Sequence, residues 1–296
     1  MSEFTHLVDI VNQTDVVENI DREDKLGQPM VHLSLVRDWG ILDFHLLSGF
    51  RERTFPGSQG RLRPAVKIDT DHATYESVAE ERRLDGVIRW SHHLGPLEFA
   101  LYQFSGTSRD PQFQVAATVD GGIVLRPHYT VIDQTGLEAQ AIFGDWAWKL
   151  EAINRHGFGD RYAAFNAGFE RTIVGVLGSR TDLGLVLEYL YDERDDEAFN
   201  TLFEHDLAFA TRWNLNDVND TQALLGVVWD VETDETIVKL ETSRRLGDTW
   251  TVLMEGRAFA GADEPADDLE ALFDPANKSA AWRDDDFIQI ELTRYF

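Results

Sequence analysis

Hydrophobic and polar residues alternate with a period of two along most of the chain. Near the N-terminal end, for example, Val31, Leu33 and Leu35 are separated by His32 and Ser34. Such alternation places one kind of side chain on each face of a β-strand. Because similar runs return throughout the sequence, the pattern predicts an all-β fold.

Most of these runs occur in pairs around short turns that contain Gly, Asp or Asn, a pattern typical of β-hairpins. The six predicted hairpins cover residues 29–50, 84–104, 135–153, 163–191, 207–230 and 236–259. Two further strands are predicted besides these twelve: a terminal strand within 285–296 and a first strand at 5–13. The pattern therefore predicts about fourteen strands, and we expect them to form one domain over residues 1–296.

The connections between the hairpins differ from the turns within them, because most are long and acidic. The long connections cover residues 14–28, 51–82, 105–127, 192–206 and 260–286. Transmembrane β-barrels combine short turns at one end of the strands with long loops at the other. The expected fold is thus an up-and-down antiparallel transmembrane β-barrel, and the alternative is a soluble antiparallel barrel or sandwich.

Charged residues occupy the centres of the predicted strands, on the face opposite the apolar stripe. They are Arg89, Glu98, Glu138, Lys149, Glu151, Glu170, Glu188, Arg212, Lys239, Glu241, Glu255, Arg257 and Glu291. A sealed core cannot hold so many charges, because each desolvated ion costs several kcal/mol unless it is paired. A water-filled lumen accepts them, so we predict that they line a pore. The exposed face of a sandwich would accept them too.

The overall charge restricts the class of protein. The chain has 53 acidic and 27 basic residues, a net charge of −26, which argues against a nucleic-acid-binding protein. The absence of cysteine excludes thiolate nucleophiles and Cys-ligated zinc. No acidic loop has the ligand spacing of an EF-hand, so we predict neither a metal nor a cofactor. Divalent cations that bridge the loops to anionic lipopolysaccharide are the alternative.

One connection is basic in this otherwise acidic chain, within residues 51–67. Its cationic residues are Arg51, Arg53, Arg61, Arg63 and Lys67. Guanidinium groups bind phosphate or carboxylate with two hydrogen bonds, so this segment is a candidate anion-attracting loop. Contacts with lipid phosphates or with the acidic loops are the alternative. Residues 263–273 are expected to form a short amphipathic helix, a second candidate plug besides the loop at 51–82.

No catalytic motif supports an enzyme. The sequence contains no GxSxG, no HExxH and no glycine-rich phosphate loop. The adjacent residues His92 and His93 lie on one predicted strand, so their side chains point to opposite faces and do not form a paired metal site. We therefore predict that the protein is not an enzyme.

The chain ends with the sequence DDFIQIELTRYF, in which Ile288, Ile290 and Leu292 alternate with polar residues and Phe296 is last. This ending resembles the C-terminal signature of bacterial outer-membrane β-barrel proteins, from which it departs at Arg294. The resemblance implies a location in the outer membrane of a Gram-negative bacterium, contact with the lipid bilayer and lipopolysaccharide, and recognition of this strand by the barrel assembly machinery.

The first residues lack the basic and apolar regions of a signal peptide, and the opening stretch is similar to the interior of longer porin-like proteins. We therefore expect a mature or N-terminally truncated form. The predicted function is a porin-like channel for passive diffusion of a small-molecule solute, with its selectivity set by lumen charges. The alternatives are a plugged barrel with a structural or surface-interaction role and a soluble secreted β-protein.

Overall fold

The computed structural model describes residues 2–15, 17, 24–57, 59–194, 201, 203–267, 269, 273, 274 and 277–296. The regular elements labelled in this part of the chain are β-strands and short 3₁₀ helices, so the prediction of an all-β fold is confirmed. Among these residues, no helix has the length and apolar character needed to cross a bilayer.

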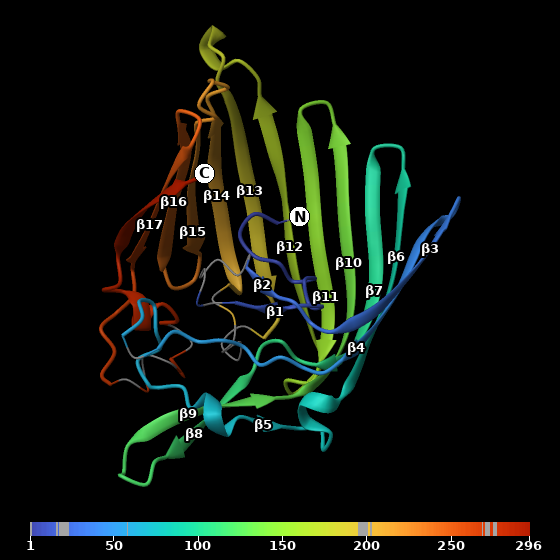
Figure 1. Ribbon diagram of the computed structural model, residues 1–296, viewed down its shortest axis with the longest axis vertical. Helices are drawn as coiled ribbons and strands as arrows, with labels where there is room; N and C mark the ends of the chain where they lie inside the picture. The colour runs from blue at the N-terminus through green and yellow to red at the C-terminus, as the bar shows by residue number, and fades with distance from the viewer. Residues whose placement is uncertain are drawn as a thin grey trace.

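Thirteen strands form one large antiparallel sheet, in which each strand pairs with the sheet strand that precedes it in the sequence (Figure 1). They are β3 (Met30–Arg37), β4 (Gly40–Ser48), β6 (Leu84–Leu94), β7 (Leu97–Thr107), β10 (Val131–Phe143), β11 (Trp146–His156), β12 (Tyr162–Ile173), β13 (Asp182–Asp192), β14 (His205–Asn214), β15 (Gln222–Asp230), β16 (Thr236–Leu246), β17 (Trp250–Ala260) and β18 (Phe287–Arg294). All six predicted hairpins occur, and the predicted terminal strand pairs with β17.

The large sheet has two edges in the described part of the chain. Strand β3 pairs only with β4, and strand β18 pairs only with β17. The sheet is therefore not seen to close, and the closed barrel of about fourteen strands stays a prediction. The side chains of both edge strands are mostly exposed.

The two ends of the sheet differ as the sequence predicts. Tight turns lie at one end, and the long connections gather at the other, shown at the bottom of Figure 1. There β5 (Thr74–Tyr75), β8 (Gln112–Ala117) and β9 (Ile123–Tyr129) form a second small sheet. Parts of the acidic connections, residues 18–23, 195–200, 268 and 270–272, lie outside the described residues. These include much of the predicted helix at 263–273, of which one helical hydrogen bond, from Phe273 N–H to the Leu269 carbonyl, is described.

The predicted first strand at residues 5–13 is wrong. Only Gln13–Thr14, strand β1, is extended and paired, and its partner is β2 (Lys25–Leu26) outside the large sheet. The rest of the segment lies in front of the large sheet in Figure 1. The Leu7 N–H and the carbonyls of Thr5 and Leu7 bond to side chains of the sheet and not to a neighbouring strand.

The apolar core lies between this N-terminal segment and the face of the sheet that it covers. Ile10 packs with Phe104 and Ile132, which are both fully buried. Further along, Phe4 packs beside Val186. Leu7 also packs against this face, beside Ile153, Tyr162 and Ala164. The core thus depends on a segment that does not belong to the sheet.

The opposite, outer face of the sheet carries large apolar side chains that remain exposed. They extend from β3, where Val31 is 68% exposed, to β18, where Ile288 is 73% exposed. The set includes Val31, Leu33, Leu46, Ile88, Leu101, Trp148, Leu187, Leu207, Phe209, Trp213, Leu225, Trp229, Ile288, Ile290 and Leu292. An exposed apolar surface that spans a whole sheet is unusual for a monomer in water.

Candidate functional site

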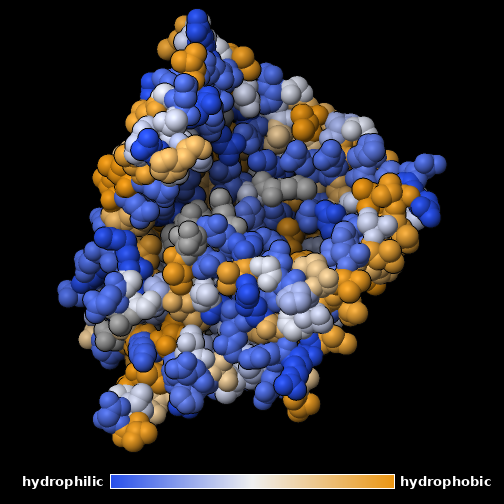
Figure 2. Space-filling model, in the orientation of Figure 1, coloured by the Kyte–Doolittle hydropathy of each residue, from blue (hydrophilic) through white to orange (hydrophobic). Residues whose placement is uncertain are grey.

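The charged residues predicted to line a pore share the inner face of the large sheet, the face that the N-terminal segment covers. The register joins them in rows: Glu138 lies opposite Glu151, and Lys239 lies opposite Arg257. The full set is Arg89, Glu98, Glu138, Lys149, Glu151, Glu170, Glu188, Arg212, Lys239, Glu241, Glu255, Arg257 and Glu291. That they line a pore stays a prediction. Figure 2 views the molecule from this side and shows mainly hydrophilic residues there.

Ion pairs neutralise many of these inner-face charges. Arg89 approaches Glu138 at 3.2 Å, and Lys149 approaches Glu170 at 3.0 Å. Further pairs on this face are Arg212–Glu170, Lys239–Glu241 and Arg257–Glu255. The inner face is therefore a network of alternating charge and not a surface of a single sign.

Two buried carboxylates on the inner face hold the N-terminal segment. Glu151, which is 1% exposed, accepts hydrogen bonds from the backbone N–H groups of Ser2 and Leu7, both at 3.1 Å. Glu188, which is 2% exposed, accepts from the Glu3 N–H at 2.9 Å and from the Ser2 hydroxyl at 2.5 Å. These bonds explain how two carboxylates stay buried in the middle of the sheet.

Amide and guanidinium groups of the sheet and its connections bind the carbonyls of the same segment. Gln134 donates to the Leu7 carbonyl at 3.3 Å, and Asn166 donates to the Thr5 carbonyl at 3.0 Å. Arg109 donates to the Val11 carbonyl at 3.1 Å. The segment is thus bound through both its donors and its acceptors. It crosses the inner face, and we call its residues 2–14 the strap.

A cavity of about 80 Å³ lies between this strap and the long-connection end of the sheet. Five basic side chains line it, Lys25, Arg53, Arg109, Arg155 and Arg194, against the three carboxylates of Asp9, Asp110 and Asp192. Basic side chains therefore outnumber acidic ones in the lining, and ion pairs with Asp9, Asp85, Asp110 and Asp192 neutralise four of the five. We call it the basic chamber.

Several donors in the basic chamber have unused hydrogen-bonding capacity. Within the described part of the chain, the Nε atoms of Arg53 and Arg109 and the hydroxyl of Tyr162 are buried without a hydrogen-bond partner. Arg53 forms an ion pair with Asp110 at 2.6 Å, and Arg109 forms one with Asp85 at 3.1 Å. An anionic oxygen in the chamber would satisfy these donors.

Burial lowers the pKa of the Arg109 guanidinium, and the adjacent Asp85 carboxylate opposes this shift. An arginine side chain nevertheless stays protonated in a protein, because the guanidinium group is a very strong base. Arg109 therefore contributes a permanent positive charge to the chamber.

The predicted anion-attracting loop is not brought together as one group. Arg53 enters the chamber, whereas Arg61 donates to the Asp286 carbonyl at 3.4 Å and lies over the Phe287 ring. Arg51, Arg63 and Lys67 are exposed. Their attraction of anions stays a prediction.

Sequence reasoning missed the arginines that surround Arg53 in the chamber. Arg155 is the penultimate residue of β11, and Arg109 and Arg194 each follow the last residue of a strand by two positions. All three lie at the long-connection end. A search for basic residues at strand ends on that side would have indicated them.

The side chains of the terminal signature do not belong to the inner face. Ile288, Ile290 and Leu292 lie on the outer face and are exposed, and so is Phe296 beyond the end of β18. The guanidinium of Arg294, where the signature departs from its pattern, lies 4.8 Å from the centre of the Phe296 ring. Recognition of this strand by an assembly machinery stays a prediction.

Comparison of the chain with protein-family models, with curated proteins and with solved structures gave no match.

Proposed function

We propose that this protein is a porin-like β-barrel of a bacterial outer membrane, through which small solutes diffuse passively. The observation that carries the proposal is the contrast between the two faces of the large sheet. Its outer face exposes apolar side chains from β3 to β18, and its inner face carries paired charges. A lipid bilayer covers the first face, and a hydrated interior accommodates the second.

The proposal requires the large sheet to close into a barrel. The unpaired backbone groups of β3 and β18 have no partner in hydrocarbon unless the sheet closes. Neighbouring strands of the thirteen alternate in direction, so β3 and β18 run the same way and their direct pairing would be parallel. One further strand between them gives fourteen, the even number that bacterial barrels have.

The basic chamber supports the proposal that the preferred solutes are small anions. Guanidinium groups with free donors bind carboxylate or phosphate oxygens, and the chamber holds two more basic than acidic side chains. The strap at residues 2–14 occupies part of the inner face, so the passage is narrow. The channel therefore favours small solutes and a low flux.

The lipid bilayer, lipopolysaccharide and the barrel assembly machinery are the partners in this proposal. Contact with the lipid bilayer and with the assembly machinery is supported by three outward apolar side chains, those of Ile288, Ile290 and Leu292. Exposed acidic residues of the long connections, such as Asp263 and Glu264, support bridging to lipopolysaccharide through divalent cations.

A second candidate function is a plugged barrel with a structural or surface-interaction role. It is favoured by the strap itself, which is hydrogen-bonded to Glu151 and Glu188 and packed over apolar side chains. A plug held in this way leaves no open path unless it moves.

Reconstitution of the purified protein into planar bilayers tests the proposed function. We expect the protein to need detergent for solubility and to give a small conductance that is greater for anions than for cations. A protein that stays monomeric and soluble without detergent contradicts the membrane proposal. A membrane-inserted protein that never conducts, even after its strap is loosened, supports the plugged barrel.

A further inference from the structure

Three buried carboxylates meet where β14 and β15 end at the long connections. Glu204 immediately precedes β14, Asp206 lies within it, and Asp230 is the last residue of β15. Their carboxylate oxygens lie within 4.8 Å of one another, and the three residues are only 4%, 2% and 5% exposed. Asp206 and Asp230 face each other directly in the strand register. We propose that this carboxylate cluster is a Ca²⁺-binding site.

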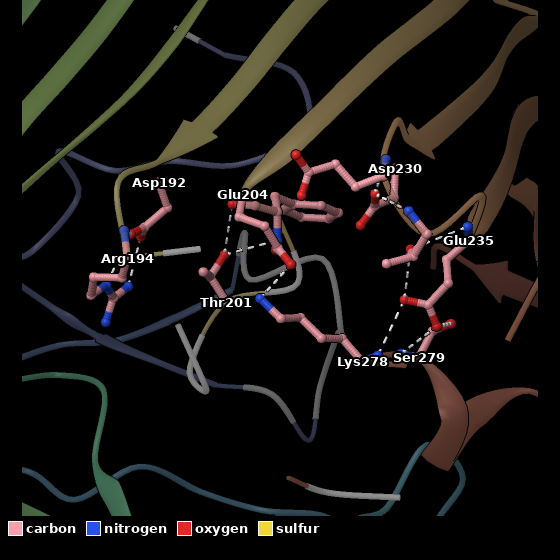
Figure 3. A network of polar contacts seen from close by, with 11 residues as sticks. Asp192, Arg194, Thr201, Glu204, Asp230, Glu235, Lys278 and Ser279 are labelled. Carbon is pink, nitrogen blue, oxygen red and sulfur yellow. Dashed lines mark hydrogen bonds and ion pairs between the residues drawn. The ribbon is translucent and has the colours of Figure 1, made fainter. Parts of the chain in front are cut away.

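Among the residues that the structure describes, the carboxylate cluster carries more negative charge than Lys278 balances. Lys278 forms an ion pair with Glu204, as Figure 3 shows, and so supplies one positive charge. A fourth carboxylate, Glu235, lies beside Lys278 and accepts hydrogen bonds from the Ser279 N–H at 3.0 Å and from its hydroxyl at 2.6 Å. Buried carboxylates so close together cannot all stay ionised without a further cation.

A second observation points to a bound ion. The Oδ2 atom of Asp206 is buried and has no hydrogen-bond partner in the part of the chain that the structure describes. Asp206 lines a small cavity of about 10 Å³ together with Asp230, Glu235 and Lys278. This is about the space of one water-sized particle. An unsatisfied carboxylate oxygen on a residue that lines such a cavity is an arrangement that a cation would complete.

The donor atoms and their spacing indicate which cation. Carboxylate oxygens alone suit hard cations such as Ca²⁺ and Mg²⁺ and are a poor match for metals that prefer sulfur. Two oxygens bound to one Ca²⁺ at ~2.3–2.6 Å lie at most ~5 Å apart, whereas two oxygens bound to one Mg²⁺ lie at most ~4 Å apart. The oxygens of the cluster lie within 4.8 Å of one another, a spacing that the longer bonds and flexible coordination of Ca²⁺ accommodate more readily than the short octahedral coordination of Mg²⁺.

The position of the cluster indicates what the ion would do. Glu204 belongs to the connection between β13 and β14, and its carbonyl accepts a hydrogen bond from the Asp192 N–H at 3.0 Å. Lys278 and Ser279 belong to the connection between β17 and β18, which Glu235 holds through three hydrogen bonds. Bound Ca²⁺ would tie the end of the connection between β13 and β14 to the last residue of β15, beside the connection between β17 and β18. This role is independent of whether the sheet conducts solutes.

Calorimetric and thermal-unfolding measurements on the full chain in detergent, freed of metal with EGTA and titrated with CaCl₂, test the proposal. We expect one Ca²⁺ per chain and a melting temperature that rises with Ca²⁺. Asp206→Asn should weaken Ca²⁺ binding by at least about tenfold, because it removes a charged ligand. The same change should raise the melting temperature in EGTA, because it also removes an unsatisfied buried charge.

Two further variants make the test specific. Lys278→Met should tighten Ca²⁺ binding, because it removes the competing internal cation, and it should lower stability in EGTA. Glu232→Gln is the matched control, since it removes an exposed carboxylate from the turn that follows Asp230. It should leave both measurements unchanged.

The proposal is overturned by an absence of Ca²⁺ binding, by tighter Mg²⁺ than Ca²⁺ binding, or by equal effects of Asp206→Asn and Glu232→Gln. If Asp206→Asn does not fold, an unchanged Ca²⁺ affinity in Lys278→Met overturns it.

Discussion

Ser2 and Glu151 are 149 residues apart in the sequence, yet the backbone N–H of Ser2 donates a hydrogen bond of 3.1 Å to the Glu151 carboxylate. Glu188 holds the next residue, Glu3, in the same way. Hydrogen bonds to charged groups contribute about 1.5–3 kcal/mol each. We predict that Glu151→Gln combined with Glu188→Gln loosens the strap and raises the conductance in planar bilayers several-fold.

The matched control for this strap variant is Glu98→Gln, since Glu98 lies on the same inner face but is exposed. Its conductance should change far less than that of the double variant, because the bonds to the strap described here come from Glu151 and Glu188. An unchanged conductance in the double variant would mean that the strap does not obstruct the passage.

The basic chamber predicts how the channel should distinguish ions. Arg155 is 8% exposed and lines the chamber, and its Nε donates to Gln134 at 2.5 Å. Arg155→Gln removes one of five positive charges, so the ratio of anion to cation permeability should fall by about half or more. Reversal potentials in a salt gradient measure this ratio. Arg63→Gln, a change of the same charge at an exposed site, should leave it unaltered, and equal effects would argue against the chamber.

Two adjacent residues of β18 allow a test of whether the outer face of the sheet contacts lipid. Ile290 is 69% exposed on the outer face, and Gln289 points to the inner face opposite Glu255. A lysine that faces lipid costs about 2–4 kcal/mol at the bilayer midplane. Ile290→Lys should therefore reduce insertion into lipid vesicles strongly, whereas Gln289→Lys should insert normally. In a soluble protein neither substitution would matter, because both side chains would face water.

A close approach between Gly136 and Tyr102 predicts a stability effect. The Tyr102 ring of β7 lies over Gly136 of β10, its partner in the register, and a Cβ atom added to Gly136 would come within 2.0 Å of that ring. Gly136→Ala should therefore displace the ring and lower the free energy of unfolding by about 1–3 kcal/mol. Denaturant titration measures this change. Gly86→Ala is the control, because the nearest atom to its new Cβ would be 3.9 Å away, and its stability should be nearly unaltered.

The strands were predictable from the sequence because alternation and turn residues act locally. The turn between Arg37 and Gly40, for example, is visible from DWG alone, and Gly40 adopts a φ of +126°. The division of charges between the faces followed from the same period of two. These features need no knowledge of contacts between distant residues.

The strap and the clusters were not predictable in this way, because distant contacts decide them. Residues 5–13 alternate like a strand, but the Leu7 N–H bonds to the Glu151 carboxylate of the sheet and not to a neighbouring strand. Asp206 and Asp230 become neighbours only through the register of β14 and β15. Arg53 and Arg61 belong to one basic stretch, yet they contact different parts of the molecule.

The bonds that hold the strap also restrict the order in which the molecule can fold. Each sheet strand pairs with the one before it, so the sheet can grow by short loop closures. The strap's bonds to Gln134, Glu151 and Asn166 instead span 127 to 161 residues. Although residues 2–14 precede every strand of the large sheet, they can settle only after β10, β11 and β12 have assembled. The earliest part of the chain is therefore among the last to reach its native position.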